Sequence, residues 1–139
     1  ANGINDVVGR EVTEMNDNRT RYERGRDILA EISGTSVDAP KAGYAIFTPA
    51  IERFLKEHLF ADIFERDLLT YRERELATVS ILAGVGGVEP MFRSHAAICL
   101  HLGVTAEQLS ALLNIVEMNL GTSYSEPLRN ILEQIVKQK

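Results

Sequence analysis

The sequence contains no tryptophan, one cysteine and few aromatic residues, and each scarcity excludes a class of structure. Aromatic residues make up 6% of the 139 residues, so we expect a mainly aliphatic core. The single cysteine, Cys99, excludes an intrachain disulfide and any metal site that needs several thiolates. No apolar run approaches the roughly 18 residues that a membrane-spanning helix requires, so no membrane partner is expected.

Basic residues are also in the minority, with 15 Lys and Arg against 20 Asp and Glu, for a net charge of −5. Because nucleic acids are bound largely through basic surface, no nucleic-acid partner is expected. The length fits one domain. Cytoplasm is the default location, but the chain starts Ala-Asn-Gly without a methionine, so export after removal of a leader stays open as an alternative.

The N-terminal third shows one clear helix. Residues 1–17 are polar and lack an apolar period, so we expect an arm that orders on a partner, followed by a single domain over 18–139. A helix over 18–32 should end at Gly34, which suits a left-handed C-terminal position. Residues 34–46 have loop composition. Thr48 and Pro49 then predict a helix to about residue 60.

Signals for helix starts and ends are more frequent in the rest of the chain. The pairs Thr70 with Glu73 and Thr105 with Gln108 each match a capping box. Together with glycines and a Glu-Pro start, they predict helices over 70–83, 89–103 and 105–120, and a last helix that begins between 125 and 127. No segment alternates strictly over a strand length. The sequence therefore predicts an all-α fold of about six helices.

Two of these helices carry candidate catalytic residues. The short joint GVGGVE should make them antiparallel neighbours. At 1.5 Å per residue, Glu75 and His95 both lie roughly 9–12 Å from the joint, so they can face each other. His95 is the polar member of an apolar stripe with Met91, Phe92 and Cys99, which are candidates to contact a substrate. A carboxylate beside an imidazole in an apolar cleft is a plausible general acid/base unit.

Each candidate has a structural alternative. His95 is equally compatible with a core histidine bonded to a backbone carbonyl, and Glu75 lies in the charged run RERE, which is typical of a solvated surface. Arg93 could grip a substrate carboxylate or simply lie on the surface. Glu89 is a candidate binding residue, but a carboxylate at a helix start also caps free amides. Cys99 in a mid-helix apolar position is typical of inert packing.

From Phe54 to about Val116 the chain resembles the carboxymuconolactone decarboxylase family, which includes alkylhydroperoxidase D. The resemblance rests on the order and spacing of FADIFERDLL, RELATV, GGVEP, RSH and GVTAEQ. It implies an alkylhydroperoxidase D-like helical bundle that assembles into homo-oligomers, as trimers or hexamers, with sites near subunit contacts. His95 matches the family's histidine, and Glu75 falls one residue from the position of its glutamate.

One branch of this family uses a Cys-x-x-Cys pair at the start of the histidine-bearing helix. The matching positions here are Val88 and Met91, so the resemblance implies that two-cysteine peroxidase chemistry is absent. The branch without cysteines is similar to the enzyme that decarboxylates γ-carboxymuconolactone without a cofactor, through proton shuttling by a histidine and a carboxylate. The text EMNLGTSYSEPLRN departs from that enzyme's pattern, which favours a related small acid as substrate.

Three functions therefore stay open. The first is a lyase or isomerase that needs no cofactor and no metal and acts by proton transfer on a small carboxylate or lactone. The second is an antioxidant peroxidase that uses Cys99 alone. The third is a protein without catalytic activity that binds a small molecule or serves assembly.

Overall fold

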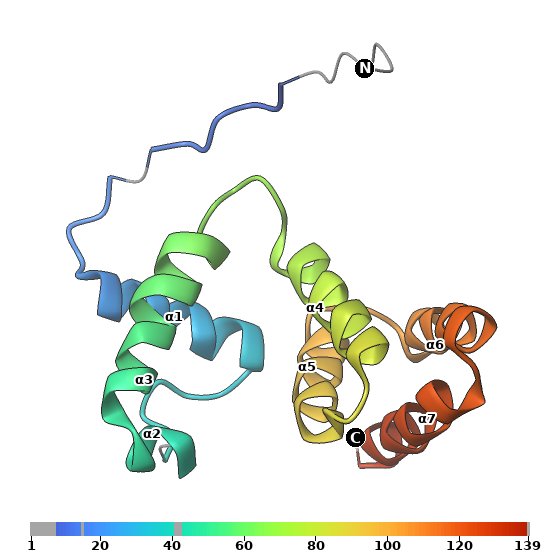
Figure 1. The fold of residues 1–139 in the computed structure, drawn as a ribbon. Coiled ribbons are helices and arrows are strands. Elements are labelled where there is room, and N and C mark those ends of the chain that lie inside the picture. Colours follow the sequence, from blue (N-terminus) through green and yellow to red (C-terminus); the bar gives the residue numbers. More distant parts are fainter. Residues whose placement is uncertain (1–7, 15, 41–42, 139) are drawn as a thin grey trace.

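The computed structural model describes residues 8–14, 16–40 and 43–138, and within them it contains helices but no strand (Figure 1). The all-α prediction is confirmed. Residues 1–7 and 15 of the expected arm lie outside the described residues. The elements are α1 (Arg21–Ser33), α2 (Gly43–Phe47), α3 (Pro49–Phe54), the π-helix η1 (Leu55–Phe64), α4 (Tyr71–Val85), α5 (Glu89–His101), α6 (Ala106–Leu120) and α7 (Thr122–Lys137).

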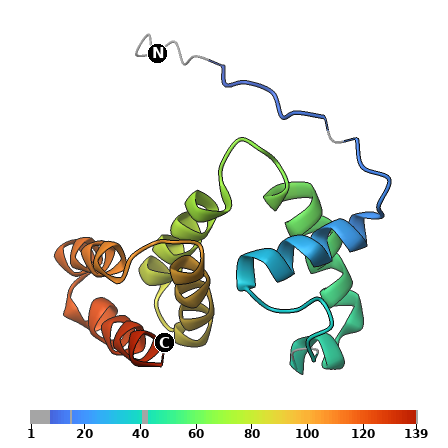
Figure 2. The same ribbon diagram turned by 180° about the vertical axis from the view of Figure 1, so that it is seen from behind.

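The helices form two groups joined by residues 65–70 (Figures 1 and 2). In the group we call the N-terminal half, α1 packs across η1, with α2 and α3 below it. In the C-terminal half, α4 packs on α5, and α6 packs on α7. The two groups meet where α1 contacts α5. The arm runs over the connecting segment, where Arg10 and Thr13 both donate hydrogen bonds to the Asp67 carboxylate.

Helix α1 is fixed at both ends and in its middle. It starts with a capping box between Thr20 and Glu23, and it ends at Gly34 with φ 67°, as predicted. A Cβ at Gly34 would also lie 2.7 Å from Cε1 of His101, which reaches across from α5. A Cβ on Gly25 would lie only 1.9 Å from the Lys56 carbonyl oxygen, so glycine allows α1 to approach η1 closely.

Two predictions for the region before residue 65 were wrong in part. Helix α2 overlaps the end of the loop expected over 34–46, and its Ala45 is buried (3% exposed). The helix expected from Thr48 to about residue 60 continues to residue 64 and changes to π-helical hydrogen bonding at Leu55. The Thr48 side chain makes no capping hydrogen bond.

The predicted helix starts and ends of the C-terminal half are largely confirmed. Both predicted capping boxes form, at Thr70 and at Thr105, and α6 ends at Leu120 as expected. The start of the last helix was wrong: α7 begins at Thr122 and contains Pro127. Its first turn is held by Ser125, a buried residue whose hydroxyl lies 3.2 Å from the Glu117 carboxylate and 3.4 Å from the Thr122 carbonyl.

The core has two parts. The N-terminal half buries a small cluster of Ile28, Ile32, Phe60 and Phe64. The C-terminal half buries a larger and mainly aliphatic cluster, which comprises Val79, Ala83, Phe92, Ala96, Cys99, Val104, Leu109, Leu113, Val116, Leu128, Ile131, Leu132 and Ile135. Helix α5 contributes to both: Phe92 and Cys99 belong to the larger cluster, whereas Ile98, together with Leu102 just after the helix, packs against the smaller one. It is therefore the helix at the seam between the halves.

Candidate active site

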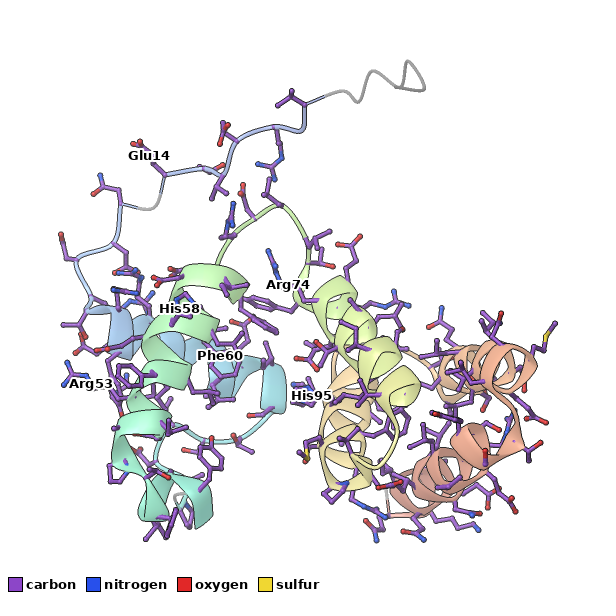
Figure 3. The ribbon with its side chains drawn as sticks, viewed as in Figure 1. Glu14, Arg53, His58, Phe60, Arg74 and His95 are labelled. Atoms are coloured by element: carbon purple, nitrogen blue, oxygen red, sulfur yellow. The ribbon has the colours of Figure 1, made fainter. Side chains whose placement is uncertain are left out.

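Glu75 of α4 and His95 of α5 form a hydrogen-bonded pair at this seam. His95 Nδ1 lies 2.7 Å from Glu75 Oε2. The Glu75 side chain is 1% exposed, whereas that of His95 is 34% exposed. Figure 3 shows His95 pointing from α5 toward the N-terminal half. The pair therefore has a buried acidic end and an imidazole that a small molecule can reach.

Local sequence features bring the two residues together. The capping box at Thr70 fixes the start of α4, one turn before Glu75. Gly86 and Gly87 have φ values of 71° and 69°, which residues with a side chain rarely adopt, and they turn the chain directly into α5. With so short a connection the two helices must lie antiparallel, which places the two side chains at similar height.

The carboxylate has an unsatisfied oxygen. Glu75 Oε1 is buried and has no hydrogen-bond partner among the described residues. The described contact of this carboxylate is therefore made through Oε2 alone.

The contact with Glu75 favours one tautomer of the imidazole. An ionised carboxylate only accepts hydrogen bonds, so with Glu75 ionised the Nδ1 atom of His95 carries the proton of the neutral ring. Its other nitrogen, Nε2, then has a free lone pair. When Nε2 takes up a proton, the carboxylate stabilises the positive charge that develops, and the buried position strengthens that interaction. The arrangement can accept a proton from a bound molecule and return it.

The only cysteine is placed for packing. Cys99 lies one turn beyond His95 on α5 and is fully buried in the larger cluster. Burial raises the pKa of its thiol to about 12, and the nearby negative charge of Glu75 acts in the same direction. Since the thiolate is the reactive form, this thiol is a poor nucleophile at neutral pH.

The remaining candidate residues have no contact with the Glu75–His95 pair among those that the structure describes, and three of them have contacts elsewhere. Arg93 donates a hydrogen bond to Gln134 of α7. Glu89 lies in the first turn of α5 and borders a shallow hollow beside Tyr124. Phe92 is fully buried in the larger cluster, and Met91 is 53% exposed.

The N-terminal half contains a second buried polar group, which the sequence analysis did not predict. Glu52 is 5% exposed and forms an ion pair with Lys56, which also contacts the Tyr22 hydroxyl. The i, i+4 spacing of Glu52 and Lys56 was the available signal, but that spacing is also common on helix surfaces. Glu52 and Lys56 are buried because α1 packs over them, and the sequence pattern does not predict that packing.

Among the described residues, no group of three or more His, Cys, Asp or Glu residues is arranged to hold a metal ion. None of their helices combines the length and the apolar character needed to cross a bilayer.

Comparison with known proteins identifies the family. A comparison with curated proteins finds no significant match. The sequence profile of the carboxymuconolactone decarboxylase family matches residues 49–133, which is more than half of the chain. The matched span runs from the start of α3 into α7 and includes both Glu75 and His95. The chain therefore belongs to the carboxymuconolactone decarboxylase family.

Proposed function

We propose that the protein is a cofactor-free lyase or isomerase that moves protons on a small carboxylate or lactone, with His95 as the acid/base and Glu75 as its orienting partner. The observation that carries this proposal is the 2.7 Å contact between a half-buried imidazole and a fully buried carboxylate. Membership of the family supports the same reaction class.

The proposed chemistry needs only these two groups. In a decarboxylation, the bond between the carboxylate carbon and its neighbour breaks, carbon dioxide leaves, and the electron pair remains on the substrate as a dienolate. His95, which has taken up a proton from water on Nε2 before this step, then transfers that proton to carbon, and the ring returns to neutral. In an isomerisation, Nε2 first removes a proton from carbon and then returns it at another position. In both cases Glu75 stabilises the protonated imidazole.

The test is a screen of small carboxylates and lactones in deuterated water, with carbon dioxide release and deuterium incorporation followed by NMR. We expect His95→Gln to lower the turnover of any active compound by about 10²-fold or more, the usual contribution of a general acid/base. Glu75→Gln should lower it by a smaller factor, because the imidazole remains. His58→Gln is the matched control, since His58 is an exposed histidine on η1. Wild-type turnover by a folded His95→Gln protein would contradict the proposal.

The peroxidase alternative has less support. A thiol that is fully buried, with a pKa raised to about 12, is not poised to attack a hydroperoxide. No second cysteine is present in the sequence to resolve an oxidised one.

We also propose that the chain forms a homo-oligomer, a trimer or a hexamer. Large apolar side chains are exposed on several helices, including Phe47 of α2 (88%), Ile81 of α4 (66%) and Met118 of α6 (85%). Exposed apolar surface of this kind is typical of contacts between subunits. Light scattering coupled to gel filtration should give three or six times the 15.5 kDa chain mass, and a monomer at micromolar concentration would contradict it.

A further inference from the structure

Arg74 of α4 spans the seam between the two halves. Its Nη2 atom donates a hydrogen bond of 2.8 Å to the Arg66 carbonyl in the connecting segment. Its guanidinium lies 5.9 Å from the centroid of the Phe64 ring of η1, which is a cation–π contact. Figure 3 shows Arg74 and His95 on the sides of their helices that face the N-terminal half. Both residues therefore lie at the same seam.

The charge of Arg74 has no carboxylate partner among the described residues. Most arginines of the chain form ion pairs with Asp or Glu, namely Arg10, Arg19, Arg21, Arg24, Arg26, Arg53 and Arg129. The half-buried Arg74 instead makes its one described hydrogen bond to a backbone carbonyl, and its Nε atom is buried without a partner in this part of the chain. A guanidinium has five N–H donors, and a charge taken partly out of water is stabilised by a counter-charge. These observations point to an anion as the missing partner.

The position of Arg74 in α4 links it to the Glu75–His95 pair. Arg74 directly precedes Glu75, so its Cα lies only about 1.5 Å away along the helix axis, and its side chain points about 100° away. Glu75 contacts His95 of α5, whereas Arg74 contacts Phe64 and Arg66. A small molecule in the seam can therefore contact the imidazole at one end and the guanidinium at the other.

Tyr71, three residues before Arg74 on the same side of α4, adds a neutral donor. Its hydroxyl makes no hydrogen bond to a described residue, and burial raises its pKa, so it keeps its proton at neutral pH. The negative charges that act on Tyr71 are those of Glu31 and Glu65. Glu65 is paired with Arg24, and Glu31 is exposed to water, which screens its charge. Arg74 is thus the charge at this end of the seam that stays unmatched in the described residues.

We propose that Arg74 binds a carboxylate of the substrate and so selects acids over neutral compounds at the His95 site, an inference that rests on the function proposed above. A guanidinium presents two donors on one edge, which match the two oxygens of a carboxylate. The carboxylate that Arg74 holds is one that the product retains, because an ion pair that stabilises a carboxylate opposes its loss as carbon dioxide. A substrate for decarboxylation then carries a second carboxyl group, whereas a substrate for isomerisation needs only one.

The test is an NMR titration of the full chain with benzoate, and with benzamide as a neutral ligand of similar shape. We expect saturable binding of benzoate, with shifts of the Arg74 Nε–H signal and of the His95 ring signals. Benzamide should bind at least 10-fold more weakly, because a charge-assisted hydrogen bond contributes about that factor to affinity. Arg74→Gln should weaken benzoate about 10-fold. Arg74→Lys, which keeps the charge but loses the two-pronged geometry, should give an intermediate affinity.

Two matched controls remove other arginines. Arg72→Gln removes an exposed arginine of the same helix, and Arg93→Gln removes the cation that the sequence favoured, so both should leave benzoate affinity unchanged. His95→Gln should still bind benzoate, so an absence of turnover in the screen above would contradict the proposed reaction alone. The Arg74 Nε–H signal of the wild-type protein tests the site even if Arg74→Gln does not fold.

Four results would each overturn the proposal. They are equal binding of benzamide, an equal loss in Arg72→Gln or Arg93→Gln, wild-type affinity in a folded Arg74→Gln protein, and an Arg74 Nε–H signal that millimolar benzoate does not move.

Discussion

The two halves of the molecule are held together by different interactions. In the described part of the chain, the core cluster of the C-terminal half comprises thirteen buried apolar residues, whereas that of the N-terminal half comprises four. The N-terminal half instead connects its helices through ion pairs, above all Arg24 of α1 with Glu65 just after η1 and Arg21 of α1 with Asp62 of η1. The C-terminal half therefore forms a well-packed base that fixes Glu75 and His95, and the smaller half forms the wall opposite them.

The largest expected effect lies in the C-terminal cluster. Phe92→Ala should lower the free energy of unfolding by about 3–5 kcal/mol, because it removes a fully buried ring from a densely packed core. Phe60→Ala, in the smaller cluster and nearer the surface, should cost less because its site can relax more easily. Urea unfolding followed by circular dichroism measures both. A larger loss in Phe60→Ala would reverse the comparison between the halves.

Ion pairing should matter most in the N-terminal half. Arg24 Nε lies 3.1 Å and 3.0 Å from the two Glu65 carboxylate oxygens, and both side chains are largely buried. Glu65→Gln should therefore lower the free energy of unfolding by about 1–3 kcal/mol. Glu57→Gln is the matched control because its partner, Arg53, is 68% exposed, and it should cost about 0.5 kcal/mol or less. Equal losses in thermal or urea melts would show that the buried pair has no special role.

Helix capping provides a smaller and more local contrast. Thr105→Ala should cost about 1 kcal/mol, because the Thr105 hydroxyl accepts a hydrogen bond from the Gln108 amide at the start of α6. Thr48→Ala should change stability little, because Thr48 makes no capping hydrogen bond at the start of α3. Both variants can be compared by urea midpoint. A cost at Thr48 equal to that at Thr105 would mean that the α3 start is capped in solution.

The same contrast explains how much the sequence could predict. In the C-terminal half, the helix starts at Thr70 and Thr105 depend on local capping boxes, and both were predicted correctly, whereas the start of α7 was not. Pi-helical bonding in η1 uses the same backbone groups as an α-helix, so no side chain in LKEHLFADIF indicates the change at Leu55. Burial of Ala45 and Glu52 depends on packing between distant segments, which local patterns do not encode.

The candidate site was also predicted in part from the sequence. The spacing of Glu75 and His95 about the short joint predicted that they could face each other, and the structure places them in contact. The apolar stripe of α5, however, is shared between two cores. Phe92 and Cys99 face the C-terminal cluster, whereas His95 faces the seam. A single stripe in a sequence does not reveal that it packs against two partners.

The most direct test is a long-range ¹H–¹⁵N NMR spectrum of the His95 side chain, assigned by comparison with His95→Gln. We predict that the neutral ring carries its proton on Nδ1, and that Glu75→Gln shifts the ring toward the Nε2-protonated tautomer. A wild-type ring protonated on Nε2, or a tautomer unaffected by Glu75→Gln, would contradict the claim that Glu75 orients His95 for proton transfer.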